Sequence, residues 1–338
     1  MFRSLSARCQ ALLLLTLLLS ACADGQRQRP QLIQIDGSST VYPIIEAMVE
    51  EFQIARQGTV QMTVGISGSG GGFKKFCRGE LDITNASRPI AASEMADCRA
   101  HDIGFIELPL AYDAITIVVH PDNNWLNHIT TQQLKSIWQP AAQETLLSWD
   151  QLDSSYPAAS LNLYGAGPDS GTFDYFTAVI VGRSHASRGD YTASEDDNLL
   201  VRGVASDRYA LGYFGLAYYF ENRDKLRAVP VVNAAGEPVL PTSTAVQNGV
   251  YRPLARPVFL YISLRAAQRP VVQDFIHYMY QPRNRQEIIS WVGYVPLTAP
   301  AYDAVMARFD ARTTGSLFSD PQTRSQTVDQ VYGLAVDG

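Results

Sequence analysis

The N-terminal region of this 338-residue sequence lacks an apolar run long enough to cross a bilayer. Its apolar stretch covers residues 11–19, whereas a membrane-spanning helix needs ~20 residues. The sequence is also poor in histidine, with five scattered residues whose spacing is not typical of a metal site. It has no basic tract, and 33 acidic residues outnumber 27 basic ones. We therefore expect no metal, no other cofactor and no nucleic-acid partner.

The first residues are typical of an export signal. Arginines and no acidic residue precede the short apolar run, and small residues follow it, which indicates a cleaved secretory signal. Residues 19–22, with the sequence Leu-Ser-Ala-Cys, resemble a bacterial lipobox. We therefore expect residues 1–21 to be a lipoprotein signal peptide, Cys22 to carry a lipid that holds the chain to a membrane surface, and residues 22–31 to form a tether. The alternative is an ordinary signal peptide in which Cys22 is incidental.

Cysteines are few as well, and export accounts for half of the four. Cys9 leaves with the signal and Cys22 is the lipidation candidate, so Cys77 and Cys98 remain. An oxidising compartment favours a disulfide between them, and two buried free thiols are the alternative.

Loss of the signal lowers the formal net charge from −6 to about −8. An anion would therefore have to be bound by donors inside a cleft rather than attracted by the overall negative field of the protein.

The mature chain alternates between short strands and helices, which indicates an α/β fold with a mostly parallel sheet. Residues 32–36 and 60–66 are typical of strands, and each is followed by a turn and a helix. A β-branched apolar run at 114–120 predicts a crossing into a second domain, and 258–262 predicts the return. We expect one lobe from residues 32–113 and 257–338, and a second lobe from residues 114–256.

Three loops between a predicted strand and a predicted helix are rich in glycine and hydroxyl groups. They are Gly37–Val41, Ser67–Gly72 and Asp169–Thr172. A helix N-terminus has unpaired N–H groups and a partial positive charge, so each junction is suited to bind an anion. Taken singly, each loop has an alternative interpretation: hydroxyls that only cap a helix, or glycines in an ordinary turn.

An arginine also lies at the end of a predicted strand. Arg88 follows Asn85-Ala86-Ser87 and precedes Pro89, and its planar set of donors suits a tetrahedral oxyanion. A surface arginine before a proline is the alternative.

Sequence patterns of common enzymes are missing. Lys74 follows the glycine loop without the Ser or Thr of a nucleotide-binding P-loop. Neither Ser69 nor Ser170 lies in a Gly-x-Ser-x-Gly elbow. We therefore expect no enzymatic activity.

The three loops and their flanking residues resemble those of the periplasmic phosphate-binding proteins of Pst-type ABC importers. The matching segments are residues 37–43, 68–74, 82–89, 169–172 and 293–297, in the family's order. The resemblance implies the type II periplasmic-binding fold, an α/β architecture of two lobes. Each lobe has a mostly parallel sheet flanked by helices, and the ligand lies in the cleft between them.

The resemblance, together with neighbouring residues, also indicates a phosphate-binding set. This set is Ser39, Thr40, Val41, Ser69, Gly70, Ser87, Arg88, Asp169, Ser170, Gly171 and Thr172. Two positions depart from the family, because many members have Asp in place of Ser87 and Arg where residues 165–167 read Gly-Ala-Gly. We hypothesise that Arg88 replaces the missing cation. Asp169 would accept the proton that phosphate keeps at neutral pH and sulfate lacks; the alternative is that Asp169 only caps a helix.

The sequence therefore predicts an extracytoplasmic, lipid-anchored monomer that captures inorganic phosphate and delivers it to the membrane permease of an ABC importer. Two alternatives stay open. One is a binding protein for another oxyanion, such as sulfate or molybdate. The other is a phosphate-sensing or adhesion lipoprotein that feeds no transporter.

Overall fold

The computed structural model describes residues 30–334 except 169, 195, 321 and 324–325. The expected signal peptide, Cys22, most of the tether and Asp169 lie outside the described residues. Within the described part, no helix combines the length and the apolar character needed to cross a membrane.

A mixed sheet runs through the molecule with the strand order β2-β1-β3-β12-β4-β8-β6-β7. These strands are β1 (Gln31–Gly37), β2 (Val60–Ile66), β3 (Ile83–Ala86), β4 (Phe105–Val119), β6 (Asn162–Ala166), β7 (Thr192–Ser194), β8 (Ala210–Gly215) and β12 (Ala255–Ser263). Pairing is parallel at both ends of the sheet, where β1 joins β2 and β3, and β6 joins β7 and β8. Antiparallel pairs all involve β4 or β12. The predicted α/β fold with a mostly parallel sheet in each half is confirmed.

Short strands complete the sheets. Strands β9 (Arg227–Ala228) and β13 (Val295–Pro296) pair with β4, and a small sheet contains β5 (Ile129–Thr130), β10 (Val231–Val232) and β11 (Pro238–Val239).

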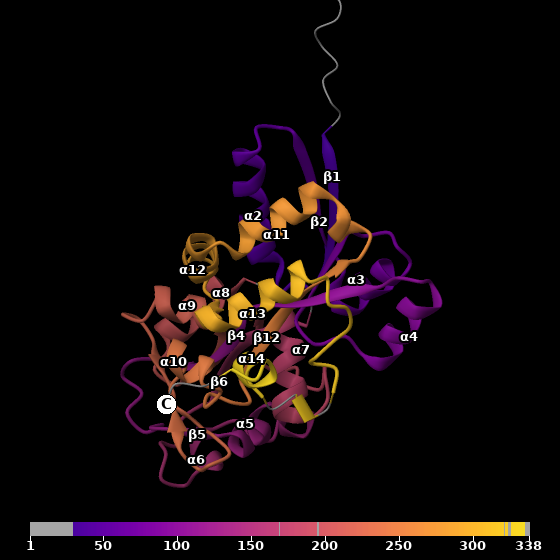
Figure 1. The fold of residues 1–338 in the computed structure, drawn as a ribbon. Coiled ribbons are helices and arrows are strands. Elements are labelled where there is room, and N and C mark those ends of the chain that lie inside the picture. The colour runs from indigo at the N-terminus through magenta and orange to yellow at the C-terminus, as the bar shows by residue number, and fades with distance from the viewer. Residues whose placement is uncertain (1–29, 169, 195, 321, 324–325, 335–338) are drawn as a thin grey trace, which may run out of the picture.

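Helices cover both ends of the main sheet, and Figure 1 shows α2 and α11 near β1 and β2, with α5 and α6 near β5 at the opposite end. The α-helices are α2 (Tyr42–Ala55), α3 (Gly68–Cys77), α4 (Ala92–Ala100), α5 (Thr131–Trp138), α6 (Trp149–Leu152), α7 (Gly171–Phe176), α8 (Asp197–Ser206), α9 (Leu216–Glu221), α10 (Ser243–Gln247), α11 (Pro270–Tyr280), α12 (Pro282–Trp291), α13 (Ala299–Asp310) and α14 (Val328–Val331). Helix α2 is amphipathic, with Ile45, Met48 and Phe52 buried at helical spacing.

Strands β4 and β12 connect the two halves of the molecule. They pair antiparallel from Ser263 opposite Phe105 to Ala255 opposite Ala114, with one irregularity between Val258 and Phe259. Both strands are longer than predicted, because charged residues and prolines interrupt the apolar pattern of their other halves. All fifteen residues of β4 are buried, including charged ones, so polar residues of this strand face protein rather than solvent. The predicted lobe boundaries fall inside β4 and β12 and stay a prediction.

Helix α3 begins earlier than the sequence predicted. The expected loop at Ser67–Gly72 is instead the first part of the helix, which starts at Gly68. A Cβ atom at Gly72 would lie 2.4 Å from Oγ1 of Thr84 and 2.7 Å from Cα of Gly37. Glycine at this position therefore lets the helix pack directly on β1 and β3.

A disulfide joins Cys77 at the end of α3 to Cys98 in α4, as predicted. In the chain-entropy model a crosslink that closes about twenty residues stabilises the fold by ~3 kcal/mol. We expect Cys98→Ser to lower the free energy of unfolding by about this amount, measured by urea denaturation. The double variant Cys77→Ser/Cys98→Ser should lose a similar amount. An unchanged stability in both variants would contradict a structural role for the disulfide.

Candidate functional site

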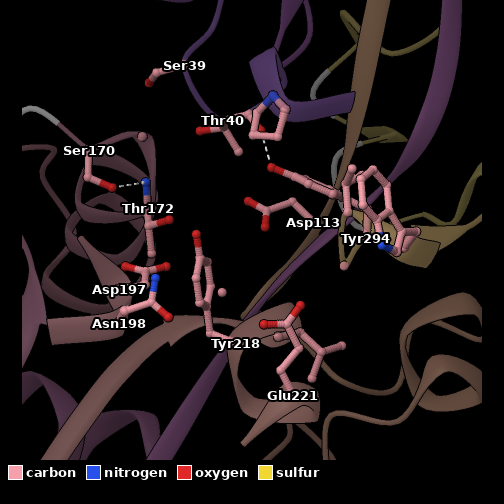
Figure 2. Close-up of a pocket in the computed structure, with 17 residues that line it drawn as sticks. Ser39, Thr40, Asp113, Ser170, Thr172, Asp197, Asn198, Tyr218, Glu221 and Tyr294 are labelled. Carbon is pink, nitrogen blue, oxygen red and sulfur yellow. Dashed lines mark hydrogen bonds between the residues drawn. The ribbon is translucent and has the colours of Figure 1, made fainter. Parts of the chain in front are cut away.

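Five residues of the predicted phosphate-binding set line one cavity of about 620 Å³, shown in Figure 2. We call it the first cavity. It is lined by Ser39, Thr40, Pro43, Asp113, Ser170, Gly171, Thr172, Asp197, Asn198, Gly215, Leu216, Tyr218, Glu221, Trp291, Val292, Gly293 and Tyr294. Ser39 and Thr40 come from the turn between β1 and α2, and Ser170 and Thr172 come from the start of α7. The structure therefore brings together hydroxyl groups from two of the three predicted loops.

The turn after β1 is shaped by glycine and by backbone hydrogen bonds. A Cβ atom at Gly37 would lie 2.1 Å from the carbonyl oxygen of Asn85, which excludes a side chain there. The amides of Ser38 and Val41 donate within this region, to Asn85 O at 3.0 Å and to Ser38 O at 3.2 Å. The predicted Val41 donor is thus part of the turn in this structure. The N-cap residue of α2 is Val41, whose side chain makes no capping hydrogen bond, and the anion-binding role of the hydroxyls in this turn stays a prediction.

Ser170 does cap a helix. Its Oγ accepts a hydrogen bond from the amide of Thr172 at 3.1 Å, which satisfies one unpaired N–H at the start of α7. The hydroxyl proton of Ser170 is left free to donate, because Oγ acts only as acceptor in this bond.

The two loops meet at Gly171. A Cβ atom at this glycine would lie 1.8 Å from Oγ1 of Thr40 and 3.2 Å from its Cβ. The start of α7 and the turn after β1 are therefore already in contact, and only a glycine permits this approach.

Arg256 lies at this meeting point, and the sequence analysis missed it. Its Nη2 donates to the carbonyl oxygen of Gly171 at 3.2 Å and lies 3.5 Å from Oγ1 of Thr40. Its Nε pairs with Oδ2 of Asp113 at 3.3 Å, and its guanidinium stacks 4.0 Å above the ring of Tyr175. The side chain is only 13% exposed. A buried guanidinium that contacts both loops is suited to hold an anion between them.

The signal for Arg256 was weak because the predicted crossing strand began at Val258. The residue lies instead in the second position of β12 and faces Asp113 of β4 in register. A lone arginine in the second position of a strand that pairs with β4 was the available clue.

The remaining predicted residues form a second group in the first half of the chain. Ser69 accepts from the amide of Ser87 at 3.1 Å, and the two hydroxyls are 3.3 Å apart. Arg88 makes two hydrogen bonds with Glu94, at 2.8 and 2.7 Å, and Gly70 lies next to its guanidinium. These bonds raise the pKa of Arg88. Both terminal nitrogens of Arg88 are therefore engaged by Glu94, whereas Arg256 pairs with Asp113 through Nε.

The two groups face different cavities, with Arg256 between them. Ser87 and Arg88 line a second cavity of about 680 Å³, and Arg256 lines it as well. Ser69 and Gly70 line neither cavity. Arg256 thus contacts Thr40 and Gly171, which line the first cavity, and shares the second cavity with Ser87 and Arg88.

Comparisons with known proteins agree with this architecture. Residues 20–283 match the family described as PBP superfamily domain. The protein SphX of Synechococcus elongatus is 49% identical over 288 residues, covering 85% of this chain and 84% of that protein. The phosphate-binding protein PstS of Staphylococcus saprophyticus is 32% identical over 303 residues, covering 87% and 91%. The chain belongs to the PstS-type family of phosphate-binding proteins.

A solved structure supports the fold of this PstS-type chain. The crystal structure of a possible phosphate-binding protein from Planctomyces limnophilus is 38% identical, with a TM-score of 0.74, and the match covers 84% of this chain and all but 1% of that one. The two-lobed periplasmic-binding fold predicted from the sequence is confirmed.

The first cavity of this PstS-type chain also has an acidic side. Burial raises the pKa of Asp113, and the guanidinium of Arg256 opposes that rise. Burial also raises the pKa of Asp197 to about 7, with smaller contributions from the negative charges of Asp113 and Asp196. These carboxyl groups can therefore carry or share protons at neutral pH.

The raised pKa of Asp197 predicts a pH dependence of stability. An unfolded aspartate titrates near pKa ~3.9, so between about pH 4 and 7 the folded state holds more protons than the unfolded state. Stability should therefore fall as the pH rises through this window. We expect Asp197→Asn to raise the melting temperature at pH 8 and to leave it unchanged at pH 4, measured by calorimetry. Asp197 is the first residue of α8, and the positive end of the helix dipole favours its ionised form. This makes the expected change in melting temperature smaller. An equal change at both pH values would contradict the prediction.

Proposed function

We propose that this chain captures inorganic phosphate outside the cytoplasm and delivers it to the permease of an ABC importer. One observation carries the proposal: the buried guanidinium of Arg256 lies where Thr40 and Gly171 of two separate loops meet. Relatives named phosphate-binding protein PstS support the choice of phosphate.

The chemistry of this arrangement suits a small tetrahedral anion. Arg256, which contacts Thr40 and Gly171 and lines the second cavity, supplies charge and N–H donors. Thr40, Ser170 and Thr172 supply hydroxyls from two sides of the first cavity. Hydrogen bonds to a charged group contribute ~1.5–3 kcal/mol each, and micromolar binding needs about −8 kcal/mol. Several such bonds suffice, even after the anion loses its water. The full proposed set keeps the residues inferred from the sequence and adds Arg256 and Asp113: Ser39, Thr40, Val41, Ser69, Gly70, Ser87, Arg88, Asp113, Asp169, Ser170, Gly171, Thr172 and Arg256.

Asp113 is our candidate for the residue that distinguishes phosphate from sulfate. Its side chain is 8% exposed and pairs with Arg256, and the residue lines the first cavity. Phosphate keeps a proton at neutral pH and can donate a hydrogen bond from it to the carboxylate of Asp113. Sulfate has no proton, so it would face the carboxylate without a hydrogen bond. Asp113 thereby takes the part that we assigned from the sequence to Asp169.

We expect Asp113→Asn to reduce the ratio of phosphate to sulfate affinity by at least about tenfold, because the amide donates to sulfate where the carboxylate repelled it. Titration calorimetry with both anions at pH 7 measures the ratio. Asp190→Asn is a matched control, since Asp190 pairs with Arg188 away from the cavity. An unaltered ratio in the Asp113 variant would remove this residue from selectivity.

The function itself is tested by titrating the mature chain with phosphate, sulfate and molybdate at pH 7. We expect phosphate to bind with a Kd near or below ~1 μM and the other two anions more weakly. If phosphate fails to bind below about 1 mM while another oxyanion binds, the chain serves that anion instead. Phosphate uptake in a deletion strain then distinguishes an importer component from a sensing or adhesion lipoprotein.

The remaining features belong to the same proposal. Residues 1–21 act as the signal peptide, Cys22 carries the lipid, and the mature chain works as a monomer without catalytic activity. The family is a solute-binding family whose members act outside the cytoplasm. Metabolic labelling with a radioactive fatty acid tests the anchor, since Cys22→Ser should abolish incorporation and release the protein from the membrane.

A further inference from the structure

We propose that the first cavity also accepts phosphate monoesters whose organic substituent carries an ammonium group. The inference rests on the proposed phosphate site at Arg256 and extends it to a larger class of ligand.

The size of the first cavity is the first argument. Its volume of about 620 Å³ lies in the range of pockets that enclose whole organic ligands, ~300–1,000 Å³. Inorganic phosphate has five non-hydrogen atoms and fills only a small part of that space.

The negative charge that Asp197 and Glu221 can give the cavity wall is the second argument. Asp197 and Glu221 both line the cavity, and neither has an ion-pair partner among the described residues. Figure 2 shows them on the side of the cavity opposite Ser39, with Tyr218 between them. Asp197 accepts a hydrogen bond from the backbone of Gly215 and Glu221 is exposed, and a negative charge at either position favours a positively charged ligand group.

Aromatic side chains are the third argument. Tyr218 and Tyr294 line the same cavity, and so does Trp291, which is 78% exposed. Ammonium groups bind over the faces of Trp and Tyr, so the aromatic and carboxylate groups favour the same kind of ligand.

An organic cation suits this wall better than a metal ion. Among the residues that the structure describes, no group of three or more His, Cys, Asp or Glu side chains is close enough to hold a metal. Together the hydroxyls with Arg256 and the acidic, aromatic wall match a molecule with a phosphate at one end and an ammonium at the other.

Titration calorimetry with O-phosphoethanolamine and ethyl phosphate tests the inference, because the two esters differ only in the ammonium group. We expect O-phosphoethanolamine to bind at least about tenfold more tightly and to compete with inorganic phosphate. We expect Glu221→Gln to weaken its binding at least about fivefold and to leave inorganic phosphate within about twofold. Glu50→Gln, on the exposed face of α2, is the control and should change neither.

The outcomes separate this inference from the proposed function. If inorganic phosphate binds but neither ester does, or if both esters bind equally, the inference is overturned and the proposed function stands. An equal loss of phosphate and ester binding in Glu221→Gln also overturns it. If O-phosphoethanolamine binds and inorganic phosphate does not, the inference is supported and the proposed function is wrong. If nothing binds, both are overturned.

Discussion

Replacement of Arg256 with glutamine is expected to weaken phosphate binding by about a hundredfold. The change removes a buried positive charge and at least one donor at the point where Thr40 and Gly171 meet. Loss of one or two hydrogen bonds to a charged group costs about 3 kcal/mol, and each 1.4 kcal/mol is a factor of ten. Titration calorimetry of the purified variant measures the effect directly.

The variant also leaves Asp113 buried without its partner, so a loss of stability has to be separated from a loss of contact. The double variant Arg256→Gln/Asp113→Asn removes the unpaired carboxylate and should regain melting temperature without regaining phosphate affinity. Arg88→Gln is the matched single change, and we expect it to cost less than tenfold because Glu94 engages both terminal nitrogens of Arg88, whereas Asp113 engages only Nε of Arg256. Equal losses at both arginines would contradict the central place of Arg256.

Gly171→Ala is expected to weaken phosphate binding by about tenfold to a hundredfold. The new methyl group would lie 1.8 Å from Oγ1 of Thr40, so the two loops could not approach as closely as they do here. Overpacking of this kind costs about 1–3 kcal/mol. The clash lies between the two loops, so we expect it to lower the affinity for phosphate more than the stability of either part of the protein. Calorimetry measures the affinity, and small-angle X-ray scattering with and without phosphate measures closure.

Gly189→Ala serves as the control for this prediction. A Cβ atom there would lie 3.4 Å from the nearest side-chain atom, and the residue does not line the first cavity. We expect its phosphate affinity to match that of the wild type. If Gly171→Ala also bound phosphate normally and closed normally, contact between the two loops would not matter for binding.

Much of the fold could be predicted because its signals are local. The strand, turn and helix around Gly37 follow from an apolar run, a glycine and apolar residues at helical spacing, and the structure has β1 and α2 there. The Cys77–Cys98 disulfide followed from the elimination of the other two cysteines. Such features depend on residues close together in the chain or on a compartment that the N-terminus indicates.

The site was harder to predict because its parts come together only in three dimensions. Arg256 contacts Gly171, 85 residues away, and pairs with Asp113 across two strands, and no local pattern marks either contact. Arg88 looked available in the sequence, but Glu94 six residues later takes up its donors. The long β4 strand was only half predicted, since buried Glu107 and Asp113 do not fit an apolar pattern.

A crystal structure of the mature chain grown with phosphate tests the central claim most directly. We expect the anion to lie within hydrogen-bond distance of Arg256 and of the hydroxyls of Thr40 and Thr172, with Asp113 still paired to the guanidinium. Phosphate bound elsewhere, with no contact to Arg256, would contradict the account.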